Sequence, residues 1–233
     1  MNTLLSSILN RSARHLSVFL LFIIFFSCSK IKNTPRFELM SSEVTGIQFN
    51  NIVLEEDSLN ILHYEYLYNG GGVGVGDLDN DGRPDLIFTG NKVLSKIYLN
   101  QGDFAFTDIT SGFEGLTNSQ WLSGVCIADV NADGWNDVYF TSTMSEDSVK
   151  RKNQLWINQG LKEGLPWFRE MADEYGIADT GYSMHAAFFD YDLDGDLDLY
   201  VLNNVINREI PTNYRIKITN GSAVNNDHLY QNL

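Results

Sequence analysis

Three stretches of the chain repeat one acidic pattern: Asp77-Leu-Asp79-Asn-Asp81-Gly82-Arg-Pro-Asp85, Asp129-Val-Asn131-Ala-Asp133-Gly134-Trp-Asn-Asp137 and Asp190-Tyr-Asp192-Leu-Asp194-Gly195-Asp-Leu-Asp198. Each places an oxygen-bearing side chain at positions 1, 3, 5 and 9 and a glycine at position 6. Ca²⁺ takes six to eight oxygen ligands, and glycine permits the tight turn that brings them together. Simple Asp/Asn/Gly turns between strands would not repeat these offsets three times. The pattern therefore predicts about three calcium sites, in loops 77–85, 129–137 and 190–198.

The predicted ligands are side chains at positions 1, 3, 5 and 9, with the backbone carbonyl at position 7. They are Asp77, Asp79, Asp81, Arg83 and Asp85 in loop 1, Asp129, Asn131, Asp133, Trp135 and Asp137 in loop 2, and Asp190, Asp192, Asp194, Asp196 and Asp198 in loop 3. Loop 2 carries a neutral oxygen at position 3, where the other loops carry a charge, so it is expected to be the weakest site.

The sequence around the loops predicts strands. A helix-flanked EF-hand needs a bidentate Glu at position 12, whereas the residues found there are Phe88, Phe140 and Val201. Short apolar, β-branched and aromatic runs precede and follow each loop, which is typical of strands. Those runs are residues 72–76 and 86–89, 124–128 and 138–141, and 186–189 and 199–202. Each loop is thus expected to join two strands of a hairpin.

Further repeated elements follow each hairpin. A third strand with a shared ending is expected at residues 97–100, 155–158 and 229–232, and a fourth at 104–109 and 167–171. A unit of about 50–60 residues with four short strands is typical of one propeller blade. The expected fold is an all-β propeller of four-stranded antiparallel blades, incomplete, with about three blades present.

At this level of detail the repeats resemble a known family. The run from Gly72 to Leu86 resembles an FG-GAP/VCBS repeat, the blade of integrin-α-like β-propellers. The order of motifs is most similar to large propeller proteins of bacterial lipoprotein type, which often end in an ASPIC/UnbV domain, although no part of this chain resembles that domain. The resemblance covers roughly residues 36–233 and implies the same side-chain ligands in the three loops.

The ends of the repeat array lead to two expectations. Two whole blades and part of a third are fewer than the roughly four to eight that close a propeller ring, so the chain is expected to be a truncated product. Phe37–Ile47 echoes Phe168–Ile177 with one residue inserted. Residues near 37 are therefore expected to form an outer fourth strand whose own blade is missing, leaving an unpaired edge.

The N-terminus predicts export. Basic residues precede an apolar run from Val18 to Phe26, which is followed by Cys28. Nine apolar residues are too few to span a membrane as a helix, so residues 1–28 are expected to be a signal peptide. The cysteine resembles a lipobox, which implies lipidation of Cys28, a tether at 29–35 and an outer-membrane lipoprotein facing the periplasm or the exterior. Cleavage by the ordinary signal peptidase is the alternative.

Charge and residue distribution argue against two functional classes. The formal net charge of −14 leaves no basic patch for phosphates, so nucleic acid is not an expected partner. The four histidines are scattered without partners at catalytic spacing, and the glycine run at 70–76 leads into an acidic loop rather than a helix, so no enzyme activity is expected. Cys126, in an apolar strand, is expected to be an inert buried thiol.

The expected function is a calcium-binding, envelope-anchored module that binds or scaffolds proteins or glycans. One alternative is a non-catalytic propeller belonging to an enzyme that degrades extracellular polymers. Another is a carbohydrate-binding lectin in which Trp121 or Trp135, in or beside loops, stacks on sugars.

Overall fold

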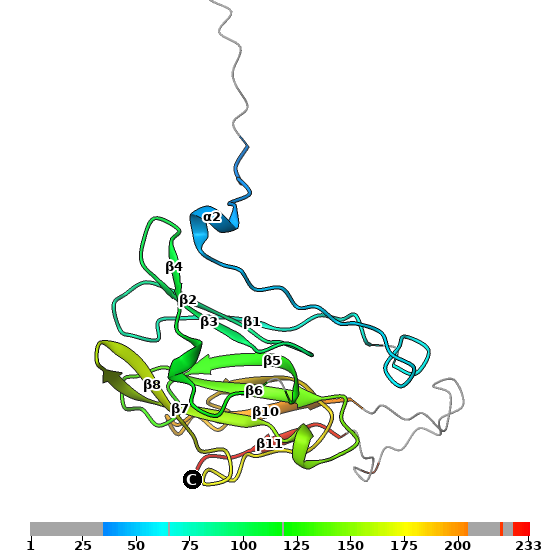
Figure 1. Cartoon of the computed structure of the whole chain (residues 1–233). Coiled ribbons are helices and arrows are strands. Elements are labelled where there is room, and N and C mark those ends of the chain that lie inside the picture. The colour runs from blue at the N-terminus through cyan, green and yellow to red at the C-terminus, as the bar shows by residue number, and fades with distance from the viewer. Residues whose placement is uncertain (1–34, 65, 118, 205–219, 221–225) are drawn as a thin grey trace, which may run out of the picture. The chain divides into compact units, whose positions relative to one another are not determined.

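Three antiparallel β-sheets form the framework of the described chain, as the computed structural model in Figure 1 shows. The structure describes residues 35–64, 66–117, 119–204, 220 and 226–233. The predicted signal peptide, Cys28 and residues 29–34 of the predicted tether lie outside these residues. Residues 40–233 form one unit, and the residues before Met40 form another. No helix in the described residues is long and apolar enough to cross a membrane.

Each sheet corresponds to one predicted blade. Blade 1 contains β1 (Val73–Gly76), β2 (Asp85–Phe88), β3 (Lys96–Asn100) and β4 (Phe106–Asp108). Blade 2 contains β5 (Trp121–Ala128), β6 (Asp137–Thr143), β7 (Gln154–Lys162) and β8 (Leu165–Glu170). Blade 3 contains β9 (Ser183–Phe189), β10 (Asp198–Asn203) and β11 (His228–Tyr230). The all-β fold of incomplete propeller blades is confirmed.

The predicted loops do join hairpins. The last residue of one strand pairs with position 9 of the loop in every case, as Gly76↔Asp85, Ala128↔Asp137 and Phe189↔Asp198. The strands follow one another in meander order, β1-β2-β3-β4 and β5-β6-β7-β8. Blade 3 is ordered β11-β10-β9. The short apolar, β-branched and aromatic runs beside the loops therefore predicted the hairpin strands correctly.

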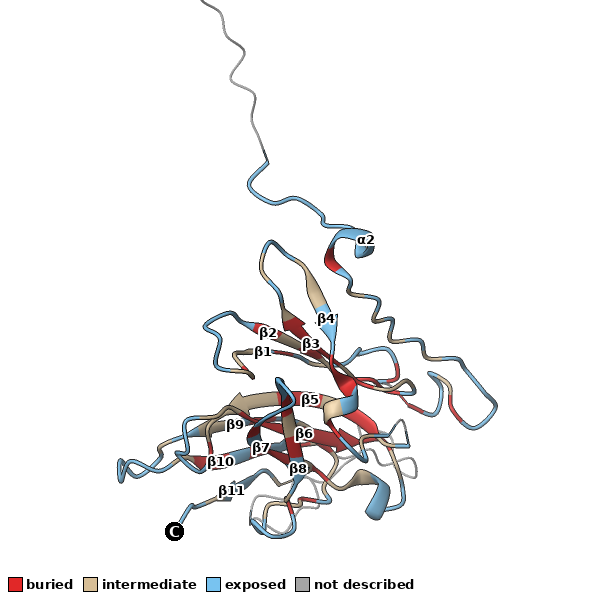
Figure 2. Ribbon diagram, turned by 60° about the vertical axis from the view of Figure 1, so that its left-hand side comes forward, coloured by how far each residue is buried: buried red, intermediate tan, exposed pale blue. Residues whose placement is uncertain are grey.

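The blades pack through their first strands, and glycine permits a close approach at the first contact. A Cβ on Gly76 of β1 would lie 2.7 Å from Cγ2 of Ile127 in β5. Side chains of β5 therefore fill the space that the glycines of β1 leave open. Figure 1 shows β5 beside β1, and Figure 2 shows it beside β9 as well.

Two apolar cores lie between neighbouring blades. The first includes Ile87 of blade 1 and Val138, Phe140 and Trp156 of blade 2. The second includes Tyr139 and Leu155 of blade 2 and Leu199 and Val201 of blade 3. β6 is buried along its whole length, and β11 is mostly exposed (Figure 2). Burial of apolar surface stabilises these contacts by about 25 cal/mol for each Å² removed from water.

The segments that precede blades 2 and 3 also contribute to the cores. Residues 109–120 lie between β4 and β5 and include the 3₁₀-helix η1 (Thr110–Gly112). Phe113 of this segment stacks on Phe168 of β8 with 4.0 Å between ring centroids. Residues 171–182 occupy the corresponding place before blade 3, and Ala172 and Ile177 pack into its core. A second 3₁₀-helix, η2 (Val149–Arg151), follows β6.

The expected outer strand near residue 37 is not formed. Residues 36–41 have no strand pairing among the described residues, and the short helix α2 (Ser42–Thr45) follows them. A strand needs hydrogen bonds to a neighbouring strand, and none is provided here. The two similar segments do share a turn conformation at their ends. Gly46 and Gly176 are both left-handed, with φ of 74° and 70°.

Trp121 is also placed differently from the expectation. It begins β5 and is only 8% exposed, in a small core with Leu59, Tyr64, Leu67 and Met144. The segment before blade 1 thus folds over the start of β5. Trp121 is a packing residue, and the hypothesis that it stacks on sugars from a loop is wrong.

Candidate metal sites

The three loops share one backbone conformation. Position 4 is left-handed in each, with φ of 59° at Asn80, 56° at Ala132 and 63° at Leu193. The glycine at position 6 is left-handed as well, with φ of 85°, 89° and 100°. A positive φ is uncommon for Ala and Leu, so the loop geometry is imposed by the flanking residues rather than by local preference.

The carboxylate at position 1 fixes the curl of each loop. In loop 1, the N–H of Asp81 donates to Oδ1 of Asp77 at 3.2 Å and the N–H of Gly82 donates to Oδ2 at 2.8 Å. The same two bonds recur at Asp129 and Asp190, with distances from 2.8 to 3.2 Å. The position-5 carboxylate similarly accepts the N–H of position 7, at 2.8–3.0 Å in the three loops.

The carboxylate at position 9 ties the loop to the third strand. In loop 1, Asp85 accepts the N–H of Leu78 at 2.7 Å and the N–H of Asn100 at 2.8 Å. Asp137 accepts from Val130 and Asn158 at 2.9 and 2.8 Å. Asp198 accepts from Tyr191 and Asn232 at 2.8 and 2.9 Å. All three aspartates are buried, so their hydrogen bonds are shielded from water.

Burial and neighbouring charges raise the pKa values of several of these carboxyl groups. Burial, together with the nearby Asp79 and Asp77, raises the pKa of Asp85 to about 6 against the two backbone hydrogen bonds. Burial and the nearby Asp133 and Asp129 likewise raise the pKa of Asp137 to about 6. Burial and then Asp81 raise the pKa of Asp79. Closely spaced anions of this kind are the setting in which a cation binds favourably.

The loops differ in which ligands they bring together. In loop 1, oxygens of Asp77, Asp79 and Asp85 lie within 4.8 Å of one another. Asp81 is instead paired with the guanidinium of Arg83, whose Nε also donates to the carbonyl of Asn100 at 2.8 Å. This exposed ion pair is weak by itself, so it is compatible with exchange of the Arg83 contact for a metal ion.

Loops 2 and 3 gather different subsets. In loop 3, oxygens of Asp190, Asp192 and Asp194 lie within 4.8 Å of one another, without Asp198 or Asp196. In loop 2, the Asn131 amide donates to Oδ2 of Asp133 at 2.9 Å. The neutral side chain at position 3 of loop 2 is thus hydrogen-bonded within the loop. Loop 2 is still expected to bind calcium most weakly.

Loops 1 and 2 are bonded to each other. The Asn80 side chain donates to the carbonyl of Gly134 at 2.9 Å, and the Asn136 side chain donates to the carbonyl of Asp77 at 2.7 Å. The Asn158 side chain of blade 2 reaches the carbonyl of Leu78 at 2.9 Å. A change in the conformation of one loop would therefore alter its hydrogen bonds to the neighbouring loop.

The shared asparagine of the third strand was the functional residue that the sequence reasoning did not single out. Asn100, Asn158 and Asn232 supply the backbone N–H that position 9 accepts. The side-chain amides of Asn100 and Asn158 also donate to loop carbonyls, at Pro84 and at Leu78 and Asn136. The signal was available, because asparagine recurs at the same offset in all three copies. Its significance depends on a contact across 15–34 residues of sequence, which spacing alone does not reveal.

Two other expectations have structural outcomes. Cys126 is a half-buried free thiol in β5, and burial raises its pKa. His228 was expected to have a structural or surface role rather than a catalytic one, and its contacts are structural. Its Nδ1 lies 2.5 Å from Oδ2 of the buried Asp179, which also accepts the hydroxyl of Tyr230 at 2.9 Å. These bonds join β11 to residues 171–182.

Repeated antiparallel sheets, each with an acidic loop between its first two strands, define a β-propeller-like module. The FG-GAP-like repeat family matches the chain twice, over residues 77–140 and 129–201. Each match begins at the first aspartate of one loop and ends in the second strand of the next blade, at Phe140 in β6 and Val201 in β10. Together they cover more than half of the chain, which therefore belongs to the FG-GAP-like repeat family. No curated protein matches the chain.

Proposed function

We propose that the protein is a calcium-stabilised binding module of the cell envelope, without catalytic activity, that recognises a protein or a glycan. The observation that supports calcium binding is the common geometry of the three loops, which gathers three carboxylates within 4.8 Å in loops 1 and 3. FG-GAP-like repeats often bind calcium and are typical of extracellular or envelope proteins, which agrees with this assignment.

The donor set fits a hard cation. Carboxylate oxygens at positions 1, 3, 5 and 9 are the ligands that Ca²⁺ prefers, and the carbonyl at position 7 adds another oxygen. Bound Ca²⁺ would supply positive charge that offsets the repulsion among these carboxylates. The chain itself holds the loop open, because positions 1 and 9 are already fixed by backbone N–H groups.

Calcium would act on folding and on presentation of the loops. Loops 1 and 2 are hydrogen-bonded to each other. Calcium bound in one loop would therefore also restrict the conformation of the other. Loops on a rigid scaffold are common recognition surfaces. Lipidation of Cys28 would attach this surface to a membrane, and intact-mass analysis of the exported protein would reveal the added acyl chains.

Calorimetric titration of the chain with CaCl₂, together with thermal melting, tests the proposal. We expect about three sites and an increase in melting temperature, with one site lost in the double variant Asp79→Ala, Asp81→Ala. The matched control is Glu56→Ala with Asp57→Ala, which removes the same charge outside the loops. A folded chain that binds no calcium at millimolar concentration would show that the loops are only turns.

The class of partner is a separate question. Trp121 is buried, so Trp135 is the remaining candidate for sugar stacking, and its ring lies 3.6 Å from the position of a Cβ on Gly160. Loss of glycan-array binding in Trp135→Ala, with unchanged calcium binding, would identify a glycan partner. Unchanged array binding would favour a protein partner.

A further inference from the structure

The hydrogen bonds between loops 1 and 2 are reciprocal. The Asn80 side chain of loop 1 donates to the carbonyl of Gly134 in loop 2. The Asn136 side chain of loop 2 donates to the carbonyl of Asp77 in loop 1. Neither asparagine is a predicted metal ligand, and each one bonds to the backbone of the opposite loop. What these two amides do depends on the peptide groups that they hold.

Asn136 holds a peptide group that also serves the position-9 carboxylate of loop 1. The carbonyl of Asp77 and the N–H of Leu78 belong to this one peptide group. Asn136 donates to the carbonyl at 2.7 Å, and the N–H donates to Oδ2 of Asp85 at 2.7 Å. The peptide group is therefore fixed on one side by loop 2 and on the other by a predicted ligand of loop 1.

Asn80 holds a peptide group of loop 2 in the same way. The carbonyl of Gly134 accepts from Asn80 at 2.9 Å. The N–H of the same peptide group, on Trp135, donates to Oδ1 of Asp133 at 2.9 Å. Hydrogen bonds in a chain polarise and strengthen one another. Each asparagine therefore strengthens the hydrogen bond that orients a predicted ligand of the other loop.

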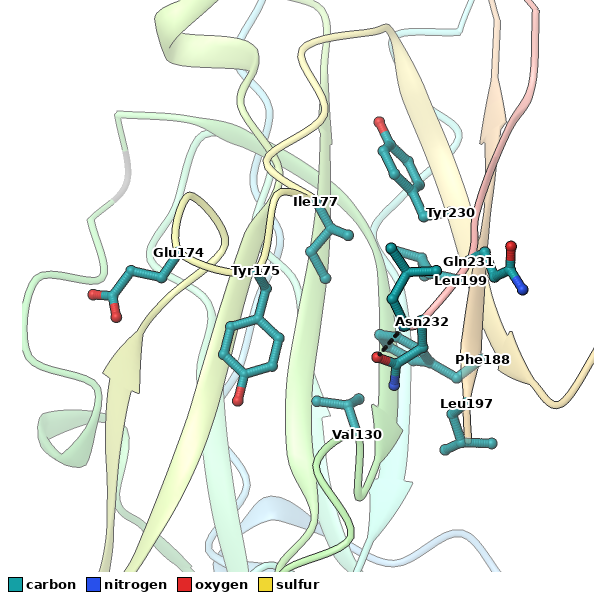
Figure 3. A pocket seen from close by; sticks show the side chains of 11 residues that line it. Val130, Glu174, Tyr175, Ile177, Phe188, Leu197, Leu199, Tyr230, Gln231 and Asn232 are labelled. Carbon is teal, nitrogen blue, oxygen red and sulfur yellow. Dashed lines mark hydrogen bonds between the residues drawn. The ribbon is translucent and has the colours of Figure 1, made fainter. Parts of the chain in front are cut away.

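Loop 3 lacks the side chains for such a connection. Position 4 of loop 2 is Ala132 and position 8 of loop 3 is Leu197, where loops 1 and 2 use asparagines. Neither side chain can donate a hydrogen bond. Leu197 instead lines a pocket of about 380 Å³ in blade 3 with Val130 and Tyr230 (Figure 3). Among the three loops, all of which the structure describes, these positions join loops 1 and 2 and do not join loops 2 and 3.

We propose that Asn80 and Asn136 are positioning residues that make loops 1 and 2 a cooperative pair of calcium sites, whereas loop 3 binds calcium independently. The inference rests on the proposed calcium binding of the loops. Ordering of loop 1 also orders the peptide group that Asn80 holds in loop 2, so loop 2 loses less conformational freedom when it binds calcium. The effect of loop 2 on loop 1 is equal by thermodynamic linkage.

Calcium titration of the full chain in a mild detergent, followed by NMR, tests the proposal. Each loop carries one glycine at position 6, Gly82, Gly134 or Gly195, whose amide signal reports that loop. Deletion of the loop 1 site with Asp79→Ala and Asp81→Ala should weaken calcium binding at loop 2 about fivefold. The same deletion should leave the affinity of loop 3 unchanged.

The same deletion in a background without the two asparagines measures their contribution. Asn80→Ala copies Ala132, which has the same left-handed conformation, with φ of 56° against 59° at Asn80. Asn136→Leu copies Leu197 of loop 3. In this background the loss of affinity at loop 2 should be about fivefold smaller. The deletion removes the same charges in both backgrounds, so their Coulomb effect cancels in the comparison.

Leu193→Ala is the matched control for Asn80→Ala. Leu193 is position 4 of loop 3, with φ of 63°, and it is 86% exposed. Its truncation changes the same loop position without removing a bond between loops. The coupling between loops 1 and 2 should therefore be unchanged in this variant.

Amide hydrogen exchange in EDTA provides a readout that needs no metal. Exchange at Leu78 and Trp135 should be about threefold faster in the variant without the two asparagines, the effect of weakening one modest hydrogen bond. The corresponding amide of loop 3, at Tyr191, donates to Asp198 and should exchange at the same rate in both proteins. Unchanged exchange at Leu78 and Trp135 would show that the asparagines do not hold these peptide groups.

Three titration outcomes would overturn the proposal. Calcium binding with an equal loss at loop 2 in both backgrounds would overturn the coupling and leave the proposed calcium binding intact. Equal losses at loops 2 and 3 would assign the coupling to long-range charge instead of the asparagines. No calcium binding at any loop would overturn the proposed calcium binding together with the coupling.

Discussion

Blade 2 and blade 3 are built from the same repeat, yet they differ in how far they are buried. All seven residues of β6 in blade 2 are buried. In β10 of blade 3, at the corresponding place, Tyr200 and Leu202 are 37% and 45% exposed. The difference follows from position, since blade 2 contacts a neighbour on both faces and blade 3 contacts a neighbour on one face among the described residues.

Equivalent tyrosines illustrate the effect. Tyr139 in β6 and Tyr200 in β10 both occupy position 11 of their repeats. Tyr139 packs edge to face against Phe188 of blade 3 and donates its hydroxyl to the carbonyl of Ile177 at 2.7 Å. Tyr200 bonds to the side chain of Asp227 at 2.6 Å within its own blade. The repeat specifies the residue type, and the neighbouring blade decides what that residue does.

Truncation of the central aromatic residue should give the largest difference between the two blades. Trp156→Ala is expected to cost about 3–5 kcal/mol of unfolding free energy, because a large, fully buried side chain leaves a cavity. Tyr230→Ala, beside the open pocket of blade 3, is expected to cost about 1–2 kcal/mol. Urea denaturation measures both values. Equal losses would mean that blade 3 is as well packed as blade 2.

Removal of the position-9 carboxylate should give the next largest effect. Asp137→Ala leaves the buried N–H groups of Val130 and Asn158 without acceptors, at a cost of about 3 kcal/mol. Asp198→Ala, beside the edge strand β11, should cost about half as much. Thermal melting in the presence of EDTA separates this structural role from metal binding. If the two variants melt alike, the edge of blade 3 is as well shielded from water as the centre of blade 2.

Asp179→Asn should loosen β11 selectively. Burial alone would raise the pKa of Asp179, but hydrogen bonds from Gly181, His228 and Tyr230 outweigh burial and hold the pKa below its ordinary value. A depressed carboxyl pKa contributes stability above about pH 4, and this contribution is lost as the pH falls through the folded-state value. We expect a loss of about 1–2 kcal/mol at pH 7. It should shrink at pH 3 and appear as faster hydrogen exchange at residues 228–230 than in β7.

The smallest expected effect concerns the calcium loops. Asn131→Asp gives loop 2 the charge that loops 1 and 3 already carry at position 3. It should tighten calcium binding at that loop about tenfold, or about 1.4 kcal/mol. The reverse change, Asp79→Asn, should weaken loop 1 by a similar factor. Calorimetry measures both, and an unchanged affinity in Asn131→Asp would show that the neutral amide does not limit loop 2.

Local sequence patterns predicted the described strands because strand pairing leaves a local signature. The runs beside each loop became β1 and β2, β5 and β6, and β9 and β10. The loop conformation was equally predictable, since glycine at position 6 and carboxylates at alternate positions act within nine residues. Contacts between distant parts of the chain escaped prediction, such as the bond from Asn158 to Leu78.

The two errors have the same physical cause. Trp121 was placed in or beside a loop. Its burial escaped prediction because the segment that covers it, including Tyr64 and Leu67, lies more than 50 residues earlier in the chain. Residues near Phe37 were read as a strand, because their sequence matches β8, but a strand exists only when a partner supplies hydrogen bonds. In both cases the deciding group is remote in sequence.

The sequence by itself determined the repeat, its strands, its acidic loops and the family, because each of these depends on side chains a few residues apart. The tertiary structure decided which equivalent residues are buried, how neighbouring loops are bonded and where blade 3 leaves a pocket. These features depend on which blade lies beside which, and the same repeat placed at the centre or at the edge gains or loses a neighbour without any change in its own sequence pattern.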